Sequence, residues 1–294
     1  MSDRRYVATS SGDVAVLDRG EGPPALFVHG VFMNGHLWDG VIDGVSDVRR
    51  CIAPDRLCHG QSRERADADV SFAGQAGTLV EVLDALEVDR VDLVGNDSGG
   101  AIAQILAARH PERIRTLTLT NCDVHDGWPP PAFMPTVQLV LGGGLRALLE
   151  SMRTDAGVAR AALAVGFEHP ERLSDDTLRA LVEPLVASDD RVRNLERFFR
   201  AMDCGQTVEI EPLLRRLDAP TLVVWGTADV FFDLAWARWL CDAIPGARDL
   251  VELPDAKLFF PYERPARLAA LLRRHWEETA GPGARAATTA TRSR

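Results

Sequence analysis

Short runs of apolar residues, bounded by turn-forming residues, recur along this chain and alternate with longer segments whose apolar residues have helical spacing. A continuous apolar run between turn residues is typical of a strand that is buried on both faces. After an antiparallel hairpin at 6–18, we predict such strands at 25–30, 50–53, 91–95, 115–120, 219–226 and 249–253, and helices at 72–86, 236–243 and 265–276. The alternation predicts an α/β fold, with a mostly parallel central sheet flanked by helices.

The middle of the chain, from about residue 125 to 214, breaks this alternation. It opens with Trp128-Pro-Pro-Pro and then shows helical periodicity without any strand-like run. We therefore expect an α/β core formed by 1–124 and 215–280, with an inserted helical cap at 125–214 over the ligand-binding edge of the sheet. The alternative is that residues 125–214 are not an insertion and belong to one continuous core. The tail at 281–294 has no large apolar residue, so we expect it to be disordered.

Composition excludes several classes of function. The chain has 294 residues and a formal net charge of −10, which argues against nucleic acid or an anionic membrane as partner. No apolar run approaches the length of a membrane span, and the N-terminus lacks a signal-peptide core, so we expect a cytoplasmic protein. The five cysteines are scattered without Cys-x-x-Cys spacing, so we expect neither a metal site nor another cofactor.

The segment that carries candidate chemistry is Gly95-Asn96-Asp97-Ser98-Gly99, where an apolar run passes directly into a helical pattern. This is the form of a nucleophile elbow, a sharp strand-to-helix turn that strains and exposes its central residue. Small residues are needed two positions before and after the centre. Gly95 and Gly99 meet this need for Asp97, whereas a centre at Ser98 would put Asn96 at a glycine position. We favour Asp97, whose carboxylate can attack carbon and form an ester; a glycine-rich turn without chemistry is the alternative.

Four landmarks follow one another in a specific order: His29-Gly30 with Trp38, then Pro54-Asp55-Arg56 with His59-Gly60-Gln61-Ser62, the elbow at Asp97, and Trp225-Gly226-Thr227-Ala228-Asp229. With these landmarks the chain resembles the α/β-hydrolase superfamily over roughly residues 5–278. Its Gly-x-Asp-x-Gly-Gly elbow is similar to that of the epoxide hydrolase and haloalkane dehalogenase branch, which uses an aspartate nucleophile beneath a helical cap. The resemblance implies an α/β-hydrolase fold.

The resemblance also implies roles for individual residues. Asp97 is the expected nucleophile, and Asp229, just past a buried strand, occupies the position of the triad acid. The backbone N–H groups of Val31 and Ser98 are expected to form the oxyanion hole. The alternative for Asp229 is that it is a turn aspartate that caps the next helix. We expect His29 to be structural rather than catalytic.

One part of the resemblance fails, because the histidine expected after the last strand is missing. Counting from both ends of the segment 254–265 places Leu258 at its position. Loss of such a base typically lowers the rate by about 10²- to 10⁴-fold, so the ester is expected to persist. His125 or a desolvated Lys257 could replace the base; a solvated surface residue is the alternative for each. Asp123 stands where some relatives place an alternative acid.

The groups that activate the electrophile in these relatives are also missing. Many dehalogenases have a Trp after the nucleophile and an Asn after His-Gly, where this chain has Ser98 and Val31. Epoxide hydrolases use cap tyrosines, but Tyr6 and Tyr262, the only tyrosines here, lie outside the predicted cap. We expect an apolar small-molecule substrate, because the candidate lining residues are aromatic: Phe32, Trp38, Trp128 and Phe133.

The sequence thus predicts a hydrolase that acts on a small, largely apolar epoxide, halide or ester/lactone, with Asp97 as nucleophile or acid/base group. The first alternative is a non-hydrolytic enzyme, such as a cyclase, lyase or isomerase, that uses Asp97 and Asp229, one of them holding a proton. The second is a catalytically inactive binding protein on the same fold.

Overall fold

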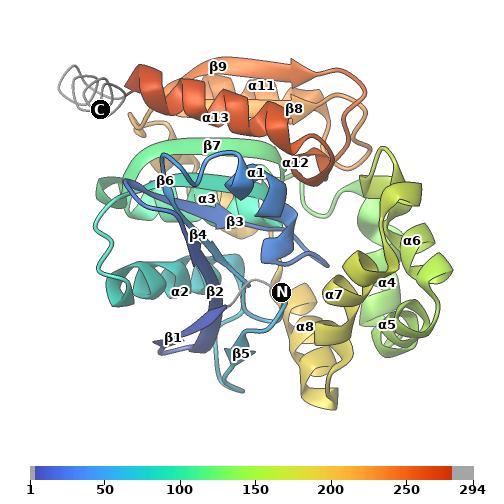
Figure 1. Cartoon of the computed structure of the whole chain (residues 1–294). Helices are drawn as coiled ribbons and strands as arrows, with labels where there is room; N and C mark the ends of the chain where they lie inside the picture. Colours follow the sequence, from blue (N-terminus) through green and yellow to red (C-terminus); the bar gives the residue numbers. More distant parts are fainter. Residues whose placement is uncertain (1–3, 280–294) are drawn as a thin grey trace.

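One mixed sheet organises the protein in the computed structural model, which describes residues 4–279 (Figure 1). Within that range the sheet has nine strands in the order β1-β2-β4-β3-β6-β7-β8-β9, with β5 paired to β2. The pairs that involve β1, β2 or β5 are antiparallel, and all the others are parallel. The strands are β1 Arg5–Thr9, β2 Gly12–Arg19, β3 Pro24–Val28, β4 Arg50–Pro54, β5 Arg63–Glu64, β6 Val91–Asp97, β7 Ile114–Cys122, β8 Thr221–Gly226 and β9 Ala247–Leu253.

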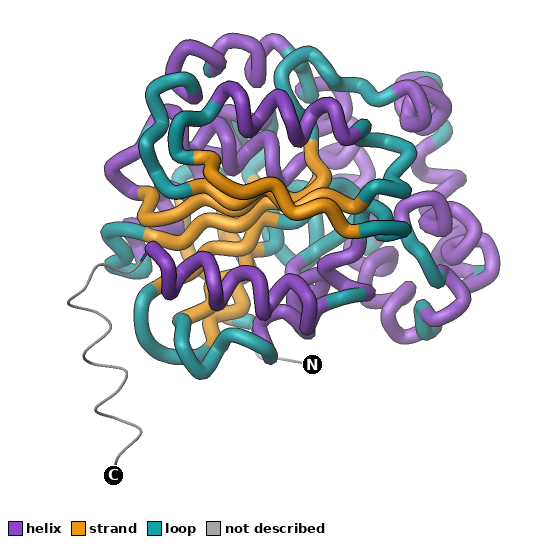
Figure 2. Tube along the Cα trace, turned by 90° about the horizontal axis from the view of Figure 1, so that it is seen from above, coloured by secondary structure: helices purple, strands orange, loops and turns teal. Residues whose placement is uncertain are grey.

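Helices cover both faces of this sheet (Figure 2). On one face α2 and α3 pack together, and on the other α1 packs against α12 and α13; α11 contacts β8 and β9. These helices are α1 Asp39–Asp43, α2 Phe72–Ala85, α3 Ser98–Arg109, α11 Leu234–Ala243, α12 Phe260–Glu263 and α13 Pro265–Thr279. Because of this double cover, every residue of β6 and β8 is buried, which explains their continuous apolar runs. The predicted fold class is confirmed.

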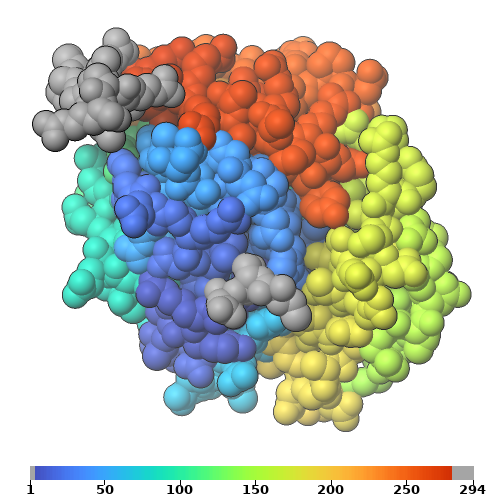
Figure 3. Space-filling view, in the orientation of Figure 1, coloured from blue at the N-terminus to red at the C-terminus, as the bar shows by residue number. Residues whose placement is uncertain are grey.

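Between β7 and β8 the described chain contains no strand and forms helices instead. They are α4 Met134–Leu141, α5 Leu145–Thr154, α6 Ala156–Leu163, α7 Asp175–Val186, α8 Asp189–Ala201, α9 Gly205–Glu209 and α10 Glu211–Leu214. The first five, α4 to α8, stand together beside one end of the sheet (Figures 1 and 3). By contrast, α9 and α10 pack against α3. We call residues 131–201 the helical segment; it ends before the boundary at 214 expected from the sequence, because the last two helices pack on the core.

Local sequence explains where the longest helices of this segment begin. The Ser174 and Ser188 side chains accept hydrogen bonds from backbone N–H groups in the first turns of α7 and α8, and two aspartates follow each serine. Both features stabilise a helix N-terminus.

Among residues 4–279 no single helix has the length and apolar composition of a membrane span. The helices Pro131–Leu141 and Leu145–Thr154 have that length and composition only when taken together, and the chain bends by 103° between them. The tail predicted to be disordered lies outside the described residues.

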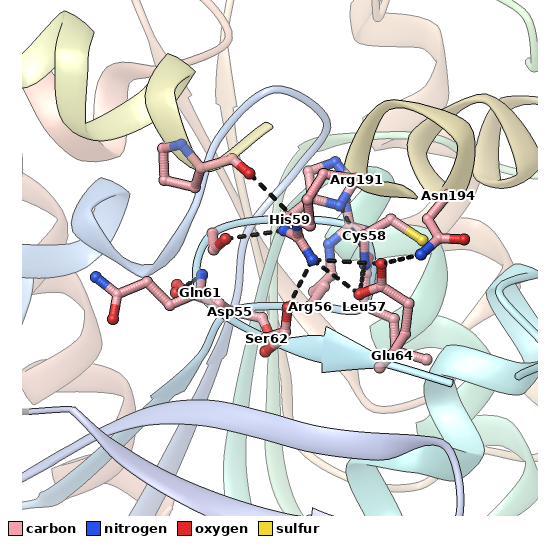
Figure 4. Close-up of polar contacts among 12 residues, drawn as sticks. Asp55, Arg56, Leu57, Cys58, His59, Gln61, Ser62, Glu64, Arg191 and Asn194 are labelled. Carbon is pink, nitrogen blue, oxygen red and sulfur yellow. Dashed lines mark hydrogen bonds and ion pairs between the residues drawn. The ribbon is translucent and has the colours of Figure 1, made fainter. Parts of the chain in front are cut away.

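The helical segment is tied to the core through Arg191 of α8 (Figure 4). Its guanidinium donates hydrogen bonds to the backbone oxygens of Ser62 (2.6 Å) and Gly60 (2.9 Å), and to a carboxylate oxygen of Glu64 (2.9 Å). The Glu64 side chain is only 1% exposed, and it also accepts a hydrogen bond from Asn194 at 2.6 Å. This buried ion pair fixes α8 over the loop that follows β4.

Candidate active site

Asp97 is the central residue of the turn between β6 and α3. Its backbone has φ 57° and ψ −136°, a strained combination for a residue other than glycine. A Cβ on Gly99 would lie 2.3 Å from the backbone oxygen of His29, and one on Gly95 would lie 2.8 Å from the Cα of Gly100. Both glycines are therefore required by close backbone approach. This is the steric reason given above for preferring Asp97 over Ser98 as the centre.

The Asp97 carboxyl is held at one oxygen and open at the other. Oδ2 accepts a hydrogen bond from the backbone N–H of Val31 at 2.9 Å, and the Ser98 N–H also donates to the carboxyl. Apart from the adjacent Ser98 N–H, no group among residues 4–279 donates a hydrogen bond to Oδ1, and the side chain lines the cavity. Val31 and Ser98 are thus together at Asp97, as the resemblance implied for an oxyanion hole. An acceptor fixed in this way can present Oδ1 to a reacting carbon.

Burial weakens the acidity of Asp97. Desolvation raises the pKa of this carboxyl to about 7, against the lowering effects of the Arg56 charge and of the two N–H donors. The carboxyl is therefore present in both its protonated and its ionised form near neutral pH. It retains a substantial nucleophilic fraction there.

Arg56 is the main site residue that the sequence analysis did not single out. It follows β4, its side chain is buried, and its guanidinium donates to Ser98 Oγ at 3.1 Å while lying over the Phe198 ring at 5.1 Å. Burial lowers the pKa of Arg56 to about 10, so the side chain stays charged at neutral pH. The residue does stand inside the quoted motif 54–62, but nothing in that motif shows that the loop reaches the start of α3.

Two more carboxyl groups follow the neighbouring strands. Asp229 comes after β8; its oxygens accept hydrogen bonds from the side chain of Asn121 (2.8 Å) and the backbone N–H of Phe231 (2.9 Å), and burial raises its pKa to about 6. Asp123 comes after β7, is buried, and has no partner on either oxygen within the described chain. Burial, followed by the Asp97 charge, raises its pKa well above the ordinary value. Neither group lines the main cavity.

The residue at the position where the resemblance places a histidine is part of an apolar cavity wall. Leu258 is buried and lines the cavity together with Asp97, and its backbone oxygen accepts a hydrogen bond from Asn96 at 3.0 Å. His125 lies elsewhere, with Nε2 2.9 Å from Glu211 and its ring against Trp239. Lys257 is adjacent to Leu258 in the chain but does not line the cavity.

His29 has a structural environment, as expected from the sequence. Its Nδ1 lies 2.8 Å from the backbone oxygen of Gly30, and Nε2 accepts the backbone N–H of Arg56 at 3.0 Å. Burial lowers its pKa well below the ordinary value, so the ring is neutral. The ring thus joins the ends of β3 and β4.

The cavity above Asp97 has a volume of about 300 Å³ and a mostly apolar wall. Core loops and the helical segment both contribute to it: Val31, Phe32, Asp97, Trp128, Pro130, Ala132, Phe133, Pro135, Thr136, Leu139, Leu148, Met152, Ala162, Leu163, Val165, Gly166, Phe231, Phe232, Leu258 and Phe259. Three of the four predicted aromatic lining residues are present. Trp38 is not, because its ring is fully buried in the core, 5.5 Å from that of Phe27. In residues 4–279 no cluster of His, Cys, Asp or Glu side chains is arranged to hold a metal ion.

Sequence and structure comparisons find the same fold in several hydrolases. A family profile described as "alpha/beta hydrolase fold" matches residues 23–265, which include β3 to β9, the elbow and the whole helical segment. Haloalkane dehalogenase 2 of Mycobacterium tuberculosis (strain ATCC 25618 / H37Rv) is 28% identical over 285 residues, 92% of this chain and 93% of the relative. The 2-hydroxymuconate semialdehyde hydrolase of Pseudomonas putida is 32% identical over 237 residues, 79% of each chain. Among solved structures, Est816, described as an N-acyl homoserine lactone degrading enzyme, has a TM-score of 0.72 at 28% identity and covers 92% of this chain and 99% of its own.

Proposed function

The chain belongs to the alpha/beta hydrolase fold family, and we propose that it is a hydrolase-type enzyme in which Asp97 forms an ester with an electrophilic carbon of a small, apolar substrate. One observation carries this proposal: Oδ2 of Asp97 is held by the Val31 N–H at 2.9 Å, while Oδ1 is open toward the apolar cavity. A carboxylate anchored at one oxygen is oriented for attack through the other.

The charges around Asp97 support this role. Arg56 is buried and positively charged beside Ser98, and it favours the ionised form of Asp97 that attack requires. Once Oδ1 is esterified, the Val31 N–H remains on Oδ2, the oxygen that becomes negative when water attacks the ester carbonyl, and the Ser98 N–H also donates to this group. The same donors therefore serve the carboxylate and the later oxyanion.

The cavity supports a substrate of the epoxide, halide or ester/lactone class. Among residues 4–279, Asp97 is the only charged side chain in the wall. Six aromatic rings contribute to it: Phe32, Trp128, Phe133, Phe231, Phe232 and Phe259. Apolar walls bind apolar ligands by removing their surface from water. We propose that the helical segment acts as a cap, because α4 to α6 supply much of this wall.

The non-hydrolytic alternative needs Asp229 to act with Asp97 on the ligand. Both oxygens of Asp229 accept hydrogen bonds from Asn121 and Phe231, and the side chain does not line the cavity. This geometry favours nucleophilic catalysis by Asp97 over an acid–base pair. Mass spectrometry of the protein after incubation with reactive ligands distinguishes a binding protein without turnover from both kinds of enzyme.

Intact-protein mass spectrometry after incubation with apolar epoxides, alkyl halides and lactones tests the proposal. We expect a covalent adduct that maps to Asp97 and is lost in Asp97→Asn. Asp123→Asn is the matched control: it removes a second buried carboxyl near the site and should keep the adduct. Ligand binding without any adduct, in folded protein, would overturn the nucleophile and favour a binding role.

A further inference from the structure

Among residues 4–279, the side chains that line the cavity include no acid or base other than the nucleophile itself. Among the residues that line it, Asp97 is the only titratable side chain. His125 and Tyr262 are hydrogen-bonded away from it, to Glu211 and Thr177 respectively. Asp123 does not line the cavity, and burial raises the pKa of its carboxyl well above the ordinary value. The described residues therefore do not supply the base expected at Leu258.

The proposed chemistry nevertheless needs two proton transfers. When Asp97 opens an epoxide, the leaving oxygen becomes an alkoxide that must gain a proton. When water then attacks the ester carbonyl, it must lose one. A group close to the reacting carbon that donates first and accepts afterwards would speed both steps.

We propose that the substrate brings this group itself, as a basic amine a few bonds from an epoxide carbon. This inference rests on the proposed function, since it supplies the proton transfers for the ester that Asp97 forms. It identifies the substrate class as apolar amino-epoxides and the reaction as amine-assisted hydrolysis to a diol.

The electrostatics of the cavity fit a substrate that enters as an ammonium ion. The wall has one carboxyl group, six aromatic rings and no lysine, arginine or histidine among the residues described. Aromatic faces and a carboxylate attract a desolvated ammonium group. Arg56, a buried cation, does not line the cavity and already contacts Ser98 and Phe198. A carboxylate-bearing ligand would be desolvated here without a positive partner.

The steps balance with water as the only other reactant. Asp97 Oδ1 bonds to the epoxide carbon, the carbon–oxygen bond of the ring breaks, and the ammonium gives its proton to the alkoxide, leaving a hydroxyl and a free amine. The amine then takes a proton from water as the hydroxide oxygen bonds to the ester carbonyl carbon, while Oδ2 carries the negative charge toward the Val31 N–H group. Collapse of this intermediate breaks the ester bond, and the ammonium returns its proton to the departing alkoxide. The Asp97 carboxylic acid that remains then gives its proton to the free amine, which restores the carboxylate and leaves the diol as an ammonium ion. The net reaction adds one water to the epoxide.

Matched substrates test the inference without altering the protein. We would compare a phenylalkyl epoxide that carries a dimethylamino group with its isopropyl isostere and with a less basic morpholino analogue. We expect all three to alkylate Asp97 in single-turnover mass spectrometry. We expect the dimethylamino compound to release diol at least about 10²-fold faster than the isopropyl compound, the scale of a general base. The pH dependence of diol release should follow the basicity of the substrate amine when dimethylamino and morpholino compounds are compared.

The possible outcomes separate this inference from the proposed function. Adducts from all compounds with equal diol release, or with none, would overturn the amine role and leave Asp97 as nucleophile. No adduct from any compound would overturn both. As an independent check, Leu258→His should speed diol release from the isopropyl compound, with Leu258→Met as the control that keeps the wall apolar; both variants must unfold at a temperature close to that of the wild type.

Discussion

Asp97 should destabilise the fold at neutral and alkaline pH, and this can be measured without knowing the substrate. The carboxyl is buried, so its pKa rises from 3.8 in the unfolded chain to about 7 in the folded protein. Asparagine has nearly the same shape, tolerates positive φ, and can still accept the Val31 N–H through its amide oxygen. Asp97→Asn therefore removes the titration and leaves the rest of the elbow intact.

The size of the effect follows from the two pKa values. A group with a raised pKa in the folded state binds more protons when folded, so its favourable contribution is complete below about pH 4 and is lost as the pH rises to about 7. Three pKa units at about 1.4 kcal/mol each give on the order of 4 kcal/mol. Relative to the wild type, Asp97→Asn should therefore gain about this much unfolding free energy on going from pH 4 to pH 8.

Urea unfolding at pH 4.5, 6 and 8, followed by tryptophan fluorescence and far-UV circular dichroism, measures this difference. Asp249→Asn is the control, because Asp249 is exposed on the edge strand β9 and its replacement should show no such pH dependence. A stability difference between Asp97→Asn and the wild type that is the same at pH 4.5 and pH 8 would refute the argument from burial. If the wild type instead gained stability relative to the variant as the pH rises, the predicted pH dependence would have the wrong sign.

Three further variants test other parts of the structure. Arg191→Met should lower the unfolding free energy by about 3 kcal/mol in a urea titration, because it leaves the buried Glu64 carboxylate without its cation. The control is Arg193→Met, which removes a cation from an exposed ion pair and should change the unfolding free energy by less than about 0.5 kcal/mol. Asp123→Asn should gain unfolding free energy relative to the wild type between pH 4 and pH 8, because burial raises the pKa of this carboxyl and so opposes its ionisation in the folded state. A difference in urea midpoint that is the same at both pH values would contradict this. Gly99→Ala should abolish adduct formation at the elbow, since its Cβ would lie 2.3 Å from a backbone oxygen, and alkylation at the wild-type rate would show that the turn can relax.

The sheet and the elbow could be predicted from the sequence because their causes are local. A strand buried on both faces needs an unbroken apolar run, and close backbone approach in the turn needs glycine at fixed positions, here Gly95 and Gly99. Each cause leaves a pattern in adjacent residues. The order of the landmarks then indicated the fold family.

The surroundings of Asp97 could not be predicted in the same way, because they depend on contacts between distant segments. Arg56 reaches Ser98 only because the loop after β4 lies beside the start of α3. Asn121 holds Asp229 because β7 and β8 are neighbours, although 108 positions separate the two residues. Trp38 was expected in the cavity from its aromatic character alone, but an indole can equally fill the core, as it does here.

The apolar wall determines both the strength of the nucleophile and the fate of its product. Excluding water raises the pKa of Asp97, so part of the protein holds the inactive acid at neutral pH. The ionised fraction is poorly solvated, which makes it more reactive toward carbon. The same exclusion, with Leu258 facing the cavity, leaves the ester without a protein base. A substrate that binds with its own positive charge would favour the ionised carboxyl and supply that base, so one property of the ligand would offset both consequences of burial.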